Sequence, residues 1–210
     1  MSELVLRTAT GVIMIVIALL AAMQGGYVFA VLAAAAATAI FYEWTRLTKG
    51  WGIAWYLGGF LYALAAAVSL LWIRERATLG FDLILWVFIV VWSTDIGAYA
   101  VGRAIGGPKL APAISPGKTW AGFYGGVAAA TILGGAWALS TGLLFVTLLL
   151  APLFAVAAQG GDLFESWMKR RAGVKDSGRW LPGHGGVFDR LDGLLPVAIL
   201  TAIAVVAHAA

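Results

Sequence analysis

Acidic, basic and glycine residues are concentrated in residues 161–193 of an otherwise apolar chain. Three aspartates, Asp162, Asp189 and Asp192, lie at the two borders of this segment, each next to a long apolar run. Carboxylate oxygens suit Mg²⁺, which binds one or two of them together with waters and substrate phosphates. Beside a cluster of cations, they indicate a Mg²⁺-dependent phosphate chemistry. The alternative is a solvated loop with ordinary positive charges, which leaves the aspartates and glycines unexplained.

The same segment holds groups that can bind an anion. If a helix begins near residue 161, one of its stripes carries Asp162, Glu165, Ser166 and Lys169, at positions i, i+3, i+4 and i+7. A glycine-rich turn at 182–186 follows, and such a turn can present several backbone N–H groups to one anion. His184 within it fits a substrate-binding or proton-carrying group and fits a structural turn equally well.

A carboxylate also lies inside an apolar run upstream. Asp95 is about six residues from one end of the run, or roughly 9 Å along a helix. A carboxylate within the membrane is costly, so a functional role is the first hypothesis. The alternative is a structural ion pair with Arg103 or Lys118.

Residues 115–119 end like a phosphate-binding Walker loop. That loop requires glycine at position 112, which is Pro112, and a preceding β-strand, which we do not expect here. A Walker loop is therefore excluded. A small, sharply turning loop remains, in which Lys118 and the hydroxyls of Ser115 and Thr119 could hold a phosphate.

Membrane helices must position these groups. The chain has 210 residues, of which 62% are hydrophobic and 11% charged, with a mean hydropathy of +0.93. A soluble domain has about 25% charged residues, and a chain this small cannot bury so much apolar surface. Cysteine is absent, which excludes disulfides and thiolate metal sites.

The apolar runs predict an all-α, polytopic transmembrane bundle of about seven spans, since one span needs roughly 20 apolar residues. The expected spans cover residues 5–23, 27–42, 52–73, 79–101, two crossings within 119–161, and 194–209. We expect one integral-membrane unit, with N-terminal spans in 1–91 and a catalytic region in 92–210.

The basic residues predict the orientation. This threading places twelve of the fourteen Lys and Arg side chains on one face and only Arg74 and Arg76 on the other. Positive loops remain in the cytoplasm. The N-terminus and loops 43–51, 102–118 and 161–192 are therefore predicted to be cytoplasmic. Glu43, at the end of an uncharged run, is interpreted as part of an interfacial helix end.

In these motifs the chain resembles the phosphatidate cytidylyltransferase family, also called CDP-diacylglycerol synthases. The matching positions, in family order, are Asp95, Ala98-Tyr99, Gly102-Arg103, Ser115-Pro116, Lys118-Thr119, Ser166, Lys169-Arg170, Lys175-Asp176-Ser177-Gly178, residues 182–186, and Asp189-Arg190-Leu191-Asp192. Two positions depart from the family pattern, Ala121 in place of Glu and Gly193 in place of Ser.

The resemblance implies an enzyme that converts phosphatidic acid and CTP to CDP-diacylglycerol and pyrophosphate with Mg²⁺. It implies metal ligands at Asp162, Asp189 and Asp192, and catalytic roles for Asp162, Asp189, Lys118, Lys169 and Asp95. Expected substrate-binding residues are Ser115, Thr119, Ser166, Arg170, Lys175, Asp176, His184, Gly185, Gly186 and Arg190.

Two other functions remain as alternatives. One is a related CTP-dependent lipid or polyprenol phosphotransferase. The other is a transporter with Asp95 as its coupling carboxylate, which is disfavoured because the chain lacks two related halves with broken helices. The expected partners are the two substrates and the bilayer of a prokaryotic inner membrane. A homodimer is left open, and nucleic acid is not expected.

Overall fold

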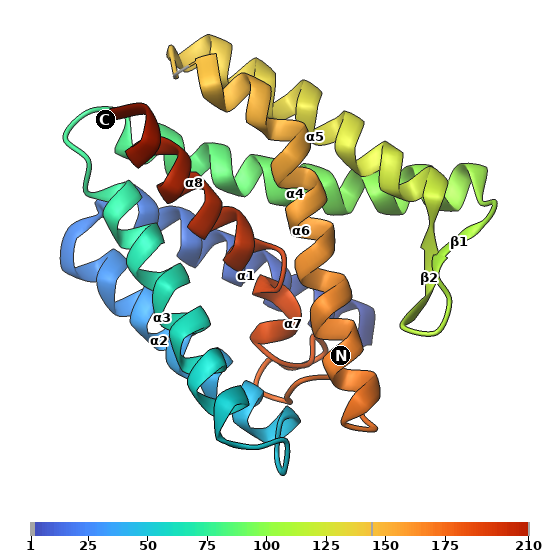
Figure 1. The fold of residues 1–210 in the computed structure, drawn as a ribbon. Coiled ribbons are helices and arrows are strands. Elements are labelled where there is room, and N and C mark those ends of the chain that lie inside the picture. Colours follow the sequence, from blue (N-terminus) through green and yellow to red (C-terminus); the bar gives the residue numbers. More distant parts are fainter. Residues whose placement is uncertain (1–2, 144, 210) are drawn as a thin grey trace.

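The computed structural model describes residues 3–143 and 145–209, which form a helical bundle with one small hairpin (Figure 1). The elements in chain order are α1 (Glu3–Gln24), α2 (Gly26–Leu47), α3 (Ile53–Arg74), α4 (Gly80–Ile105), β1 (Lys109–Ala111), β2 (Ser115–Thr119), α5 (Trp120–Thr141), α6 (Phe145–Arg171), α7 (Phe188–Leu191) and α8 (Leu194–Ala209).

The helices confirm the predicted transmembrane bundle. Six of them, α1 to α6, are long and apolar enough to cross a membrane, and α8 is a shorter apolar helix of 16 residues. Many large apolar side chains on them are exposed on the outside of the bundle, such as Ile13, Leu61 and Leu139. Lipid is the solvent that such a surface requires. The protein is therefore an integral membrane protein.

The hairpin β1–β2 was not predicted. Its strands are antiparallel, and Lys109 pairs with Thr119 and Ala111 with Ser115. The expected sharp turn at 115–119 is thus wrong, because these residues form strand β2 and the turn lies at 112–114. The hairpin joins α4 to α5, and the Thr119 side chain begins α5 by accepting a hydrogen bond from the Gly122 N–H at 3.1 Å.

Small residues allow α4 and α5 to pack closely along their length. A Cβ at Gly97 would lie 2.6 Å from the Ala129 Cβ, and one at Gly126 would lie 2.7 Å from the Thr94 carbonyl oxygen. Without a hydrophobic drive between helices in lipid, such close backbone approach supplies much of their association. The packing of α4 on α5 fixes the position of Asp95 relative to the hairpin.

The end of α3 fastens the turn between α1 and α2. The Arg74 guanidinium donates to the carbonyl oxygens of Ala22 and Met23, and the Glu75 carboxylate accepts from the Gly26 N–H at 2.8 Å. These bonds satisfy backbone groups that the two helix ends would leave unpaired. Gly25 has a φ of 66°, and a side chain on it would overlap Arg74.

The segments with polar chemistry gather toward one end of the bundle. Figure 1 shows the N-terminus of α1, the α2–α3 turn, the hairpin and the loop leading into α7 toward the same end, with the α3–α4 loop and the C-terminus at the opposite end. The Arg170 guanidinium reaches the Ile114 carbonyl at the hairpin tip, 3.1 Å away. The arrangement matches the one-sided distribution of charge in the sequence.

The cytoplasmic orientation gives a first testable prediction. A single cysteine at Lys175, which is exposed in the loop before α7, should resist an impermeant thiol reagent applied outside sealed cells and react after the cells are opened. Position 177 is unsuitable because Ser177 is only 4% exposed. A cysteine at Thr78, exposed in the α3–α4 loop, is the matched control and should react from outside. The reverse pattern contradicts the orientation.

Candidate active site

Asp162 and Lys118 form an ion pair that joins α6 to the hairpin. The Lys118 ammonium lies 2.6 Å from Asp162 Oδ2, and both side chains are partly exposed. One turn further along α6, the Ser166 hydroxyl donates to Asp162 Oδ1 at 3.3 Å. The predicted polar stripe of α6 is therefore present. Its Asp162 meets Lys118 because the hairpin folds back on α6.

Asp192 lies close to Asp162 because Gly161 permits it. A side chain at Gly161 would overlap the Asp192 carbonyl oxygen, so α6 passes the start of α8 at backbone distance. Burial raises the pKa of Asp192 well above its usual range, and the negative charge of Asp162 raises it further. The Gly193 N–H donates to Asp192 Oδ1 at 2.7 Å, and this hydrogen bond lowers the pKa of Asp192.

Asp95 completes a group that we call the carboxylate cluster, formed by Asp95, Asp162 and Asp192 with Lys118. Asp95, on α4, lies within electrostatic range of both Asp162 and Lys118 and also acts on Asp192. Lys118 contacts Asp162 directly, while Arg190 acts electrostatically on Asp95 and Lys169 on Asp192.

Asp189 belongs to a different set of contacts. Its Oδ1 lies 2.6 Å from the Lys169 ammonium, and its Oδ2 accepts from the Ser177 N–H, the Ser177 hydroxyl and the Gly186 N–H at 2.8–2.9 Å. Burial raises the pKa of Asp189, but its hydrogen bonds, including those from Lys169 and Gly186, outweigh burial and lower the value to about 2. Lys169 also pairs with Glu165. Lys169, predicted to hold a phosphate, thus contacts two carboxylates.

Glu43 is the functional residue that the sequence analysis missed. It is fully buried on α2, and its carboxylate accepts from the Ser177 hydroxyl at 2.9 Å and from the N–H groups of Val187 and Phe188 at 3.0 and 2.8 Å. Glu43 lies one turn before the end of α2, as expected, but its side chain is buried and hydrogen-bonded within the protein. Glu43 holds the loop before α7 by three bonds to residues more than 130 positions away. We call Glu43, Ser177, Asp189 and Lys169 the loop anchor.

The glycines of the signature make room for the loop anchor. A side chain at Gly178 would overlap Glu43, and one at Gly186 would overlap both Glu43 and Ser177. Gly185 has a φ of 83°, which favours glycine, and the adjacent Asp176 and Asp189 leave little space beside it. The role of Gly186 is thus to bring its N–H to Asp189.

The remaining predicted residues lie around these two groups. His184 packs beside Gly11 of α1 with its Nδ1 buried and unpartnered among the described residues, while its carbonyl accepts two hydrogen bonds from Arg190. Lys175 and Asp176 are exposed in the loop. Ser115 begins β2, and Thr119, predicted to bind phosphate, is 5% exposed and caps α5.

Comparison with known proteins decides the family. A sequence model described as the cytidylyltransferase family matches residues 49–208. The chain is also 38% identical to a phosphatidate cytidylyltransferase of Brucella suis biovar 1, over 95% of this chain and 92% of the relative. The protein belongs to the cytidylyltransferase family. Proteins with the same name in Pseudomonas aeruginosa and Bacillus subtilis are 44% and 48% identical over 69% and 59% of this chain.

The match to the family model covers every predicted site residue but begins after Glu43. The matched segment begins at residue 49, on the far side of the α2 C-terminus from Glu43. The loop anchor therefore joins an element outside the matched segment to the core of a cytidylyltransferase. The boundary between the predicted parts 1–91 and 92–210 falls within α4.

The predicted metal ligands fit Mg²⁺ in part. In the described part of the chain, no group of three or more His, Asp or Glu side chains is arranged to hold a metal ion. Asp189 accepts hydrogen bonds from Lys169, Ser177 and Gly186, so a metal ion at Asp189 would compete with these donors. Asp162 and Asp192 can still supply the one or two carboxylates that Mg²⁺ takes beside phosphates. Mg²⁺ binding by this cytidylyltransferase stays a prediction.

Proposed function

We propose that the protein transfers CMP from CTP to phosphatidic acid, forming CDP-diacylglycerol and pyrophosphate for phospholipid synthesis. The observation that carries the proposal is the carboxylate cluster with Lys118 at one end of a membrane bundle, where a water-soluble nucleotide can meet a lipid headgroup. Membership in the cytidylyltransferase family and the names of the bacterial relatives support this reaction.

The reaction is one displacement at phosphorus. An oxygen of the lipid phosphate attacks the α-phosphorus of CTP, the bond from that phosphorus to the β-phosphate oxygen breaks, and pyrophosphate leaves. Two polyanions must approach each other, so the protein contributes mainly positioning and charge neutralisation. Lys118, partly exposed on β2, can turn from Asp162 to a phosphate. Arg170, also exposed beside the hairpin tip, provides a second cation.

Bound Mg²⁺ would neutralise charge on the phosphates, and Asp162 and Asp192 are the residues that would hold it. The loop anchor acts indirectly, by positioning the loop before α7. Asp189 and Glu43 keep the 175–186 loop against α6 and α2, so that this loop lies at the same end of the bundle as the hairpin (Figure 1). Lys169 contributes by holding Asp189 and Glu165 together.

We further propose that the protein resides in a bacterial inner membrane with this end facing the cytoplasm, where CTP is found. The bacterial origin of the relatives and the one-sided basic residues support this placement.

Position-specific labels of CTP test the reaction directly. Purified protein in lipid–detergent micelles is incubated with phosphatidic acid and either α- or γ-labelled CTP, with Mg²⁺ or with EDTA. The α-label should enter the lipid, the γ-label should appear in pyrophosphate, and EDTA should stop both. Transfer of the γ-label to lipid would instead assign the protein to CTP-dependent lipid kinases, and no labelled lipid in any arm would contradict the proposal.

A further inference from the structure

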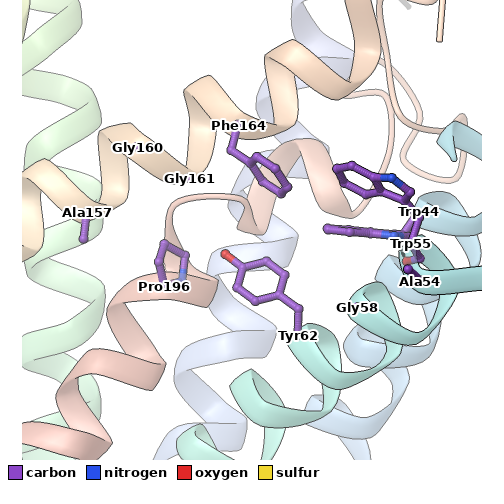
Figure 2. Close-up of a pocket in the computed structure, with 10 residues that line it drawn as sticks. All are labelled: Trp44, Ala54, Trp55, Gly58, Tyr62, Ala157, Gly160, Gly161, Phe164 and Pro196. Atoms are coloured by element: carbon purple, nitrogen blue, oxygen red, sulfur yellow. Dashed lines mark hydrogen bonds between the residues drawn. The ribbon is translucent and has the colours of Figure 1, made fainter. Parts of the chain in front are cut away.

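An apolar cavity of about 670 Å³ lies beside the carboxylate cluster, between α2, α3, α6 and α8. Figure 2 shows four aromatic side chains around it, those of Trp44, Trp55, Tyr62 and Phe164. A volume of this size is within the range of pockets that hold small organic ligands. None of the residues of the carboxylate cluster or the loop anchor lines it.

The cavity is continuous with the candidate active site. Its α6 wall includes Gly161, the neighbour of Asp162, and its α8 wall includes Pro196, which would touch a side chain at Gly161. The Tyr62 hydroxyl points toward this side of the cavity in Figure 2 and lies within electrostatic range of Asp192. One end of the cavity is thus polar and adjacent to the reacting groups, and the rest is hydrocarbon-like.

The cavity also opens sideways toward lipid. Ala54 and Gly58 of α3 and Gly160 of α6 line it and are exposed. On the same helix α3, Ile53 and Leu57 are 72% and 57% exposed, which marks this surface as lipid-facing. A hydrocarbon chain can therefore enter from the bilayer without crossing water.

The lining disfavours the nucleotide base as occupant, although aromatic rings can stack on bases. Recognition of a base edge needs free donors and acceptors in the pocket. The Trp44 indole N–H already donates to the Trp55 carbonyl at 2.8 Å, which leaves the Tyr62 hydroxyl and the Trp55 indole N–H as the polar side-chain groups of the lining, and neither is an amide or a charged group that could read a base edge. An apolar occupant meets no such requirement.

We propose that this cavity holds the headgroup-proximal part of one fatty acyl chain of the phosphatidic acid, and that Gly58 and Gly160 keep the space for it. The proposal rests on the proposed function for the identity of the lipid. A Cβ added at Gly58 or at Gly160 would meet nothing within 4 Å, so the absence of a side chain at both positions leaves open volume from two facing helices. Tyr62 then marks the boundary between the chain and the headgroup.

Filling the cavity tests the proposal. Gly58→Leu and Gly160→Leu place a side chain into it from opposite walls, and both replace glycine within a helix by a better helix former, which favours folding. Ala65→Leu, at an exposed position of α3, is the matched control. Each variant is assayed with dioleoyl phosphatidic acid, and the concentrations of the lipid and of CTP are varied in turn.

The KM for the dioleoyl lipid should rise on the order of tenfold in both filled variants, because two or so methylene groups lose their burial. The KM for CTP should stay within about twofold of the wild type, and Ala65→Leu should match the wild type throughout. A selective rise in the KM for CTP would assign the cavity to the base, and an unchanged KM for the lipid in both filled variants would also overturn the proposal.

A binding experiment separates this inference from the proposed function. Phosphatidic acid with a photoreactive diazirine near the start of one acyl chain is irradiated with the wild type, and the labelled peptides are identified. Label should appear in residues 54–62 and 157–164 and be lost in Gly58→Leu, whether or not the protein turns over CTP. Label confined to other segments overturns the cavity even in an active enzyme, and this labelling in an inactive enzyme overturns only the reaction.

Discussion

Replacing Asp162 by Asn should lower CDP-diacylglycerol formation by on the order of 10³-fold, the scale expected when one group that stabilises developing charge is removed. The side chain keeps its shape and its contact with Ser166, but Lys118 loses the negative charge 2.6 Å away. The carboxylate cluster also loses the member best placed to bind a cation. Raising Mg²⁺ to saturation should therefore not restore the rate, measured as transfer of α-labelled CMP to lipid.

Asp82→Asn is the matched control for this prediction. Asp82 is an aspartate in the first turn of α4, at the opposite end of the helix from Asp95, and its backbone carbonyl accepts from the Trp137 indole. The substitution leaves that bond intact, so activity should remain within about twofold of the wild type. Retention of a tenth or more of the wild-type rate by Asp162→Asn would remove Asp162 from the reaction.

The second large effect is expected at Glu43. Glu43→Ala leaves the N–H groups of Val187 and Phe188 without their acceptor in a buried place, while the Ser177 hydroxyl retains Asp189 as its acceptor. Each unsatisfied buried group costs about 1–3 kcal/mol, so the loop should detach from α2 and activity should fall at least about 100-fold. Glu43→Gln keeps one acceptor oxygen and should be intermediate between the wild type and Glu43→Ala.

Limited trypsin digestion measures the loop itself. Trypsin cleaves after Lys175 and Arg179, both exposed in the loop. Cleavage at these sites should be much faster in Glu43→Ala than in the wild type, with Glu43→Gln between the two. Glu75→Ala is the control, because Glu75 also binds a backbone N–H but at the other end of the bundle. It should leave these two sites as slow as in the wild type. Equal digestion of Glu43→Ala and wild type would contradict the anchoring role.

The helices and one half of the site could be predicted from the sequence because their signals are local. Uncharged runs place the spans, and the i, i+3, i+4, i+7 spacing places Asp162 and Ser166 on one face of α6, where the structure has them bonded. The basic residues predict a shared end for loops that are distant in the chain. Each of these inferences needs only neighbouring residues or a count of the basic residues on each side of the membrane.

The sequence predictions fail where contacts between distant parts of the chain determine the structure. The i, i+3 spacing of Asp189 and Asp192 would place both on one face of a longer helix, but α7 is a single turn. Asp189 therefore binds the Gly186 N–H, while Asp192 lies near Asp162. The burial of Glu43 depends on a loop more than 130 residues later. Its one local signal is that a lone carboxylate directly follows an uncharged run of 35 residues.

The Arg74–Glu75 fastening of the α1–α2 turn sets an order for biogenesis. Because α1 and α2 are synthesised before α3, the carbonyls of Ala22 and Met23 and the N–H of Gly26 lack these partners until residues 74 and 75 reach the same end of the bundle. We therefore expect the α1–α2 turn to take its final structure only after α3 is in place.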